Sequence, residues 1–180
     1  MPRYLALFGS INVGGNRLTM ADLRWAFERE GFERVETVVA SGNVLFDFDE
    51  RPTDGLEDLF SYMMADRFDI RSFVAVRSRN ELARAIDGNP FAADGAENLV
   101  HTHFLADQPA QAQFDDLIAA YSGRGPERLA MGDRALYVDY VDGAGNTKLT
   151  GPFIERRLGC PGTARNIRSL RRILGKMDEN

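Results

Sequence analysis

Residues 92–105, with the sequence AADGAENLVHTHFL, contain a linker of small residues followed by the start of a strand. Residues 92–96 consist of Ala, Asp and Gly, which is typical of a connection between units. Residues 100–105 have the length and the composition of a strand. A pattern of strands and helices that has already run once begins again at Val100, and this restart decides the fold that we predict.

Before the linker, the chain has the pattern of a βαββαβ unit. Thr19 and Asp22 have the spacing of a capping box, and Gly31 ends the helix that they begin. Residues 52–68 have apolar side chains at helical spacing, and Ser78 and Glu81 form a second capping box. The predicted strands are residues 3–8, 35–40, 44–48 and 72–77.

After the linker, a similar order of elements follows. The predicted strands are residues 100–105, 128–131, 135–141 and 163–166, and the predicted helices are residues 109–121, 153–158 and 167–174. This repetition predicts an α+β fold, a tandem pair of ferredoxin-like βαββα(β) units with antiparallel sheets and a C-terminal basic helix. We expect the units to be residues 1–94 and 95–180, with a ligand cleft between them.

Composition excludes several classes of protein. Hydrophobic residues make up 44% of the 180 residues, which is enough for a packed core. No apolar segment approaches the ~20 residues of a membrane helix, so we expect no membrane association. Cys160 is the only cysteine, which excludes an intrachain disulfide and favours a cytoplasmic location. No cofactor motif is present, and we expect no cofactor.

Charge is divided unevenly along the chain. Residues 147–180 contain eight Lys or Arg and three acids, a net charge of +5. The other 146 residues contain fourteen bases and twenty-four acids, a net charge of −10. Arg168, Arg171 and Arg172 have the spacing of one basic helix face. This block either binds a phosphate or carboxylate, or pairs with the acidic body and docks the C-terminus.

A glycine-rich loop, residues 9–16, lies between the first strand and the first helix. Gly9 and Gly14 have the spacing of a phosphate loop, but Gly15 and Asn16 stand where such a loop needs Lys and Ser or Thr. The loop is therefore no Walker loop. It is either an anion-binding nest of backbone N–H groups or a tight connection.

Four other side chains are candidates for chemistry or for contacts. His101 and His103 have the i, i+2 spacing of two metal ligands, but no third ligand is marked, so we expect solvent-facing residues and no metal. Cys160 follows Arg156 and Arg157, which favour a thiolate, although a lone cysteine is typically an inert small hydrophobe. Trp25 falls off the apolar face of its helix, which indicates either a contact surface or a half-covered surface residue.

Four segments resemble the uncharacterised bacterial family called domain of unknown function 1697. They are ALFGSINVGGN at residues 6–16, VVASGNVLF at 38–46, NPF at 89–91 and TKLTGPFIERRLGCPGTARN at 147–166. The resemblance implies an α+β protein with no assigned activity. Gly9-Ser10 and Ile167 depart from the family's usual Arg-Gly pair and aromatic residue, which weakens a nucleic-acid interpretation.

The resemblance and the charge pattern together indicate a ligand site. We expect a binding protein for an anionic ligand, either a phosphorylated small molecule or nucleic acid. An enzyme acting on a small phosphate- or carboxylate-bearing substrate and a small oligomeric interaction protein are the alternatives. The predicted ligand-binding residues are Asn12, Gly14, Gly15, Ser41, Asn43, Lys148, Arg165 and Asn166.

Overall fold

Two four-stranded antiparallel sheets and six helices make up the part of the protein that the computed structural model describes, residues 1–9, 18–39 and 42–179. The protein is therefore mixed α+β, as predicted. Both sheets are open, and every strand pairing in them is antiparallel.

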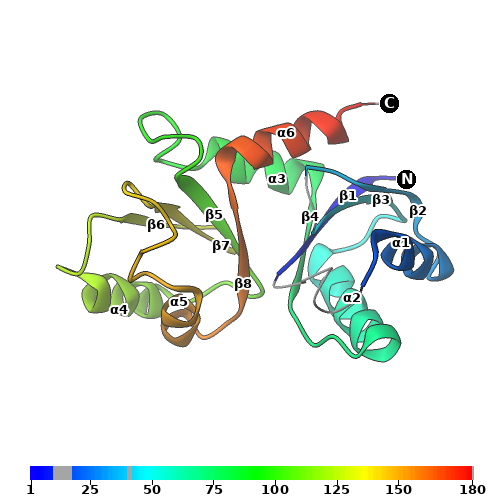
Figure 1. Cartoon of the computed structure of the whole chain (residues 1–180), viewed down its shortest axis with the longest axis horizontal. Helices are drawn as coiled ribbons and strands as arrows, with labels where there is room; N and C mark the ends of the chain where they lie inside the picture. Colours follow the sequence, from blue (N-terminus) through cyan, green and yellow to red (C-terminus); the bar gives the residue numbers. More distant parts are fainter. Residues whose placement is uncertain (10–17, 40–41, 180) are drawn as a thin grey trace. The chain divides into compact units, whose positions relative to one another are not determined.

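The first sheet has the strand order β2-β3-β1-β4 (Figure 1). Its strands are β1 (Arg3–Phe8), β2 (Glu33–Thr37), β3 (Asn43–Asp47) and β4 (Val74–Ser78), and its helices are α1 (Met20–Arg29) and α2 (Thr53–Phe68). Phe27 of α1 and Phe60 of α2 stack at 4.6 Å between ring centroids, and both rings contact Phe46 of β3. The two helices therefore share one apolar core on one face of the sheet.

Local signals in the sequence explain where these helices begin and end. The hydroxyl of Thr19 accepts a hydrogen bond from the backbone of Asp22 at 3.0 Å, as its predicted N-cap position requires. Ser78 and Glu81 form the predicted capping box at the start of α3 (Arg79–Asp87), because each side chain bonds the other residue's backbone N–H. Gly31, with φ 90°, follows α1 in a conformation that glycine adopts without strain.

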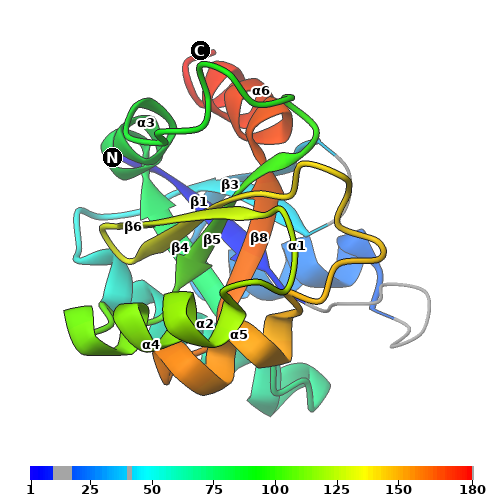
Figure 2. The same ribbon diagram turned by 90° about the vertical axis from the view of Figure 1, so that its left-hand side faces the viewer.

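The second sheet has the strand order β6-β7-β5-β8. Its strands are β5 (Val100–Leu105), β6 (Arg128–Gly132), β7 (Ala135–Asp139) and β8 (Gly162–Asn166), and its helices are α4 (Gln111–Tyr121) and α5 (Gly151–Leu158). Figure 2 shows α4 and α5 on the same face of this sheet, where Leu117, Ile154 and Leu158 join Leu136 and Val138 in one core.

The chain divides into two units by the contacts that its residues make. One unit is Met1–Ala83 together with Arg172–Asn180, and the other is Arg84–Arg171. The last helix, α6 (Ile167–Met177), begins in the second group of residues and ends in the first. The predicted division at residues 94 and 95 remains a prediction about which parts of the chain fold independently.

The described residues form no helix that is both long enough and apolar enough to cross a bilayer.

Candidate functional site

Half of the residues predicted to bind a ligand lie outside the described part of the chain, namely Asn12, Gly14, Gly15 and Ser41. The anion nest predicted for the glycine loop therefore stays a prediction. The remaining residues are Asn43 in the first unit and Lys148, Arg165 and Asn166 in the second.

Asn43 is buried at the start of β3 and has a structural role there. Its side-chain amide donates a hydrogen bond to the carbonyl of Val39 at 2.7 Å, across the connection between β2 and β3. Val39 and Gly42 both have positive φ, 50° and 90°. The Asn43 amide links the start of β3 to the backbone of Val39 from inside the protein.

Asn166 is the last residue of β8 and caps α6. Its side-chain oxygen accepts a hydrogen bond from the backbone of Ser169 at 2.8 Å, and the backbone of Arg168 donates to the carbonyl of Glu97 at 3.4 Å. The first N–H groups of this helix were expected to be free for an anion, and two of them are occupied by the protein itself.

Arg165 is partly buried on β8, directly opposite Thr102 of β5. Its guanidinium donates at 2.9 Å to the hydroxyl of Thr163 and at 2.9 Å to the carbonyl of Ala164. Burial lowers the pKa of Arg165 to about 10, because a desolvated cation is disfavoured. Thr102 is fully buried, and within the described part of the chain its hydroxyl has no hydrogen-bond partner.

The first turn of α6 has the charge opposite to the one that a helix start favours. It contains no acidic residue, and the exposed Arg168 lies within it. One turn later, Arg171 approaches the carboxylate of Glu97 at 3.8 Å. Because the N-terminus of a helix has a partial positive charge, Arg165 and Arg168 raise a potential that is already positive. The two guanidinium groups and the start of α6 therefore add positive potential at this junction of β8 and α6.

Lys148 is exposed in the connection between β7 and α5, next to residues with structural roles. Thr147 donates a hydrogen bond to Glu127 at 2.6 Å, and Leu149 is part of the core. Thr150 is the N-cap of α5 and accepts from the backbone of Phe153 at 3.3 Å. Thr147, Leu149 and Thr150 therefore have structural roles, and Lys148 between them faces solvent.

His103 is buried, and the prediction that the two histidines face solvent is wrong. Its Nε2 lies 3.0 Å from the hydroxyl of Tyr140, and the ring of His101 meets the same tyrosine edge-on. The alternation of side chains along β5 predicts that the histidines lie on the face opposite to the buried Thr102. The helix α5 covers that face, so His103 is buried there. Both faces of β5 are covered.

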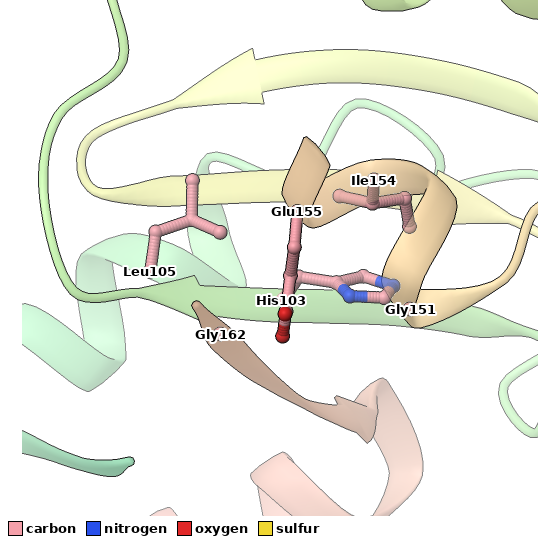
Figure 3. A pocket seen from close by; sticks show the side chains of 6 residues that line it. All are labelled: His103, Leu105, Gly151, Ile154, Glu155 and Gly162. Atoms are coloured by element: carbon pink, nitrogen blue, oxygen red, sulfur yellow. The ribbon is translucent and has the colours of Figure 1, made fainter. Parts of the chain in front are cut away.

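A small cavity of about 20 Å³ adjoins His103, which is room for about one water molecule. Figure 3 shows the imidazole extending from β5 beneath α5, whose residues Gly151, Ile154 and Glu155 line the cavity. Burial and the nearby His101 lower the pKa of His103 to about 4, so the ring is neutral at pH 7. The space is too small for an organic substrate.

The structure gives no sign of a reactive thiol at Cys160 or of a metal site among the described residues. Burial raises the pKa of the Cys160 thiol, so the activation by neighbouring arginines that the sequence allowed is not found. Within residues 1–9, 18–39 and 42–179, no three His, Cys, Asp or Glu side chains lie close enough together to hold a metal ion.

Trp25 is 52% exposed on α1, in agreement with its predicted position off the core face. Arg29 and Arg67 lie over its ring, at 5.3 and 5.4 Å from the ring centroid. Arg67 also donates to Glu30 at 2.8 Å, so a carboxylate holds one of the two guanidinium groups that lie over the indole. The two guanidinium groups stabilise an aromatic side chain that is exposed on the surface.

Comparison with known proteins identifies relatives of unknown function. A family model described as "Protein of unknown function (DUF1697)" matches residues 1–137, more than half of the chain. The chain is also similar to the solved structure of the conserved bacterial protein SP0830 from Streptococcus pneumoniae, with 23% identity, a TM-score of 0.71 and 99% of each chain covered. At this identity the likeness shows the fold alone. No curated protein matches the chain.

Proposed function

Because the chain belongs to this family of proteins of unknown function, whose description assigns no activity, we propose from the geometry that it binds an anionic ligand at the junction of β8 and α6. The observation that supports this proposal most is the positive charge of that junction. The first turn of α6 has Arg168 and no acid, and the partly buried Arg165 directly precedes the N-cap Asn166.

The partial burial of Arg165 supports the proposal. A guanidinium that is partly removed from water gains more from an anion than an exposed one does, because the local dielectric is lower. The hydroxyl of Thr102, which has no hydrogen-bond partner among the described residues, lies at the opposite position on β5. The glycine loop, Ser41 and the exposed Lys148 remain separate candidates for contacts with the same class of ligand.

A phosphorylated small molecule fits this proposal better than nucleic acid does. The protein has a net charge of −5, whereas nucleic-acid binding depends on neutralising many phosphates at once. The cavity beside His103 holds about one water molecule, so it gives no support to an enzyme whose substrate binds there. A cytoplasmic location stays part of the proposal and is supported by the free, buried thiol of Cys160.

We also propose that each unit is a ferredoxin-like half of a tandem pair. The strand orders β2-β3-β1-β4 and β6-β7-β5-β8 support this proposal, because corresponding strands occupy corresponding places in the two sheets. The placement of two helices on one face of each sheet is a second supporting feature.

Thermal-shift measurements with pyrophosphate, AMP and a short single-stranded RNA test the ligand proposal. We expect pyrophosphate and AMP to stabilise the wild-type protein, and Arg165→Gln to weaken binding by about 1.5–3 kcal/mol, the range for a hydrogen bond to a charged group. Arg168→Gln serves as a second variant because Arg168 is exposed and tolerates substitution.

Arg156→Gln is the matched control, since it removes the same charge from an exposed position on α5. Equal stabilisation of all three variants and the wild type would show that the junction is not the site. Stabilisation by the RNA alone would replace the small-molecule ligand with nucleic acid.

A further inference from the structure

A second cavity, of about 310 Å³, opens at the end of α4 and has the size of a small-ligand site. Its lining includes Ile118 and Tyr121 of α4, Gly125 in the following connection, and Glu127 and Leu129. All of these residues belong to the second unit, and none takes part in the anion site proposed above.

The carboxylate of Glu127 is fixed in this cavity by two neutral donors. The hydroxyl of Tyr121 donates to Oε2 at 2.5 Å, and the hydroxyl of Thr147 donates to Oε1 at 2.6 Å. Burial opposes ionisation of Glu127, but the hydrogen bonds from Thr147 and Tyr121 outweigh it and hold its pKa below the ordinary value. Each carboxylate oxygen accepts one of these two hydrogen bonds and keeps further lone-pair capacity.

Among the described residues, no Lys, Arg or His forms an ion pair with Glu127. Arg124 lies nearby in the chain, but its guanidinium is over the ring of Phe153, 5.5 Å from the centroid. An ionised carboxylate that is oriented by two hydroxyls gains most from a charged donor.

Gly125 keeps the carboxylate and the tyrosine in place. A Cβ atom at this position would meet Glu127 Oε2 and would lie 2.6 Å from the hydroxyl of Tyr121. The backbone of Gly125 therefore packs directly against the Tyr121–Glu127 hydrogen bond. This close approach fixes the oxygen atoms on the cavity wall.

An apolar surface lies next to the carboxylate in the same cavity. Ile118 is 38% exposed although it is a large aliphatic residue, and Leu129 is partly buried against the core. We propose that this cavity binds a primary ammonium group carried on a short apolar chain. The ammonium group donates to Glu127, and the alkyl chain covers Ile118 and Leu129.

Titration of three matched probes against the wild-type protein tests this inference, with NMR or calorimetry as the readout. The probes are n-hexylamine, which is protonated at pH 7, n-hexanol and hexanoate. We expect n-hexylammonium to bind with a Kd of roughly 1 mM, the range for a ligand of this size. n-Hexanol and hexanoate should each bind at least about tenfold more weakly, because they lack the positive charge. Equal binding of n-hexylammonium and n-hexanol would overturn the proposal.

Variants connect the binding to the named residues. Glu127→Gln should weaken the binding of n-hexylammonium by about tenfold. Asp116→Asn removes the same charge from an exposed position on α4 and should leave the binding unchanged. Ile118→Ala should weaken the binding by roughly threefold through lost apolar contact. Because Ile118 is partly exposed, the Ile118→Ala variant should retain the fold. It therefore tests the proposal even if Glu127→Gln does not fold. Unchanged binding in either folded variant would contradict the proposal.

The ammonium group can come from a free amine or from a lysine side chain. Comparison of n-hexylamine with Nα-acetyl-lysine amide distinguishes them, since only the second has backbone amides to accommodate beside Ile118. Tighter binding of n-hexylamine assigns a free amine as the ligand, and tighter binding of the blocked lysine assigns a peptide. If neither probe binds while the anion site still binds its ligands, this inference is wrong and the proposed function is unaffected.

Discussion

At the scale of single residues, the imidazole of His103 is buried beneath α5 with its Nε2 3.0 Å from the hydroxyl of Tyr140. Its pKa is lowered from an ordinary value of 6.5 to about 4, first by burial and then by the nearby His101. The folded protein therefore holds a neutral ring at a pH where the unfolded chain binds a proton. This difference makes stability depend on pH.

We predict that His103 lowers stability in acid. Its folded pKa is depressed, so its full contribution is present above about pH 6.5 and is lost as the pH falls toward 4. The loss from this residue is at most about 3 kcal/mol, since one pKa unit corresponds to about 1.4 kcal/mol. Urea unfolding between pH 7.5 and pH 4.5 measures it.

His103→Gln is the comparison, because glutamine has no proton to gain and retains a hydrogen-bonding group for Tyr140. The variant should show a smaller fall in its free energy of unfolding than the wild type over this range. Parallel curves for the two proteins would mean that His103 is not the group responsible.

Residue-scale predictions from the sequence succeeded where the signal is local. The caps at Thr19 and Ser78 depend on residues three positions away, so their spacing is visible in the chain. The burial of His103 depends on α5, which lies about fifty residues later. The Arg77–Glu57 ion pair, 2.7 Å long and buried between β4 and α2, likewise gives no local sequence signal.

At the scale of elements, α5 ends at Gly159, which adopts the left-handed conformation with φ 76°. Glycine is favoured at this position because a Cβ atom strains it, and here the Cβ would also lie 2.8 Å from the side-chain nitrogen of Gln113. The end of α5 and the start of the segment leading into β8 thus depend on one glycine.

We predict that Gly159→Ala destabilises the protein by about 1 kcal/mol or more, measured by chemical unfolding. Gly175→Ala is the control, because Gly175 lies inside α6 and a Cβ there meets no atom within 4 Å. That change should stabilise the protein by about 0.4–1 kcal/mol, since alanine favours a helix more than glycine does. Effects of the same sign in both variants would contradict the explanation.

At the scale of the whole molecule, the last nine residues group with the beginning of the chain. Arg172–Asn180 and Met1–Ala83 form one unit, and Arg79 binds the carboxylate of Asp178 through two bonds of 2.9 and 3.1 Å. The restart at Val100 predicted two sheets of similar order, and it gave no indication of how the last nine residues group. The contacts of these C-terminal residues with the beginning of the chain are long-range, and the spacing of apolar residues in the sequence does not predict such contacts.

Removal of residues 172–180 should therefore weaken the first unit, although the deleted residues follow the second in sequence. Ile173 is fully buried and Met177 is 6% exposed, and burial of two such side chains contributes about 3–6 kcal/mol. Trp25, the only tryptophan, lies in the first unit, so its fluorescence reports that unit's unfolding. We expect the midpoint of this transition to move to a lower urea concentration in the chain that ends at Arg171. The midpoint should stay in place in a chain that ends at Asp178, because that chain retains both apolar residues and the partner of Arg79. An unchanged Trp25 transition in the shorter chain would mean that the C-terminal residues contribute no stability to the first unit.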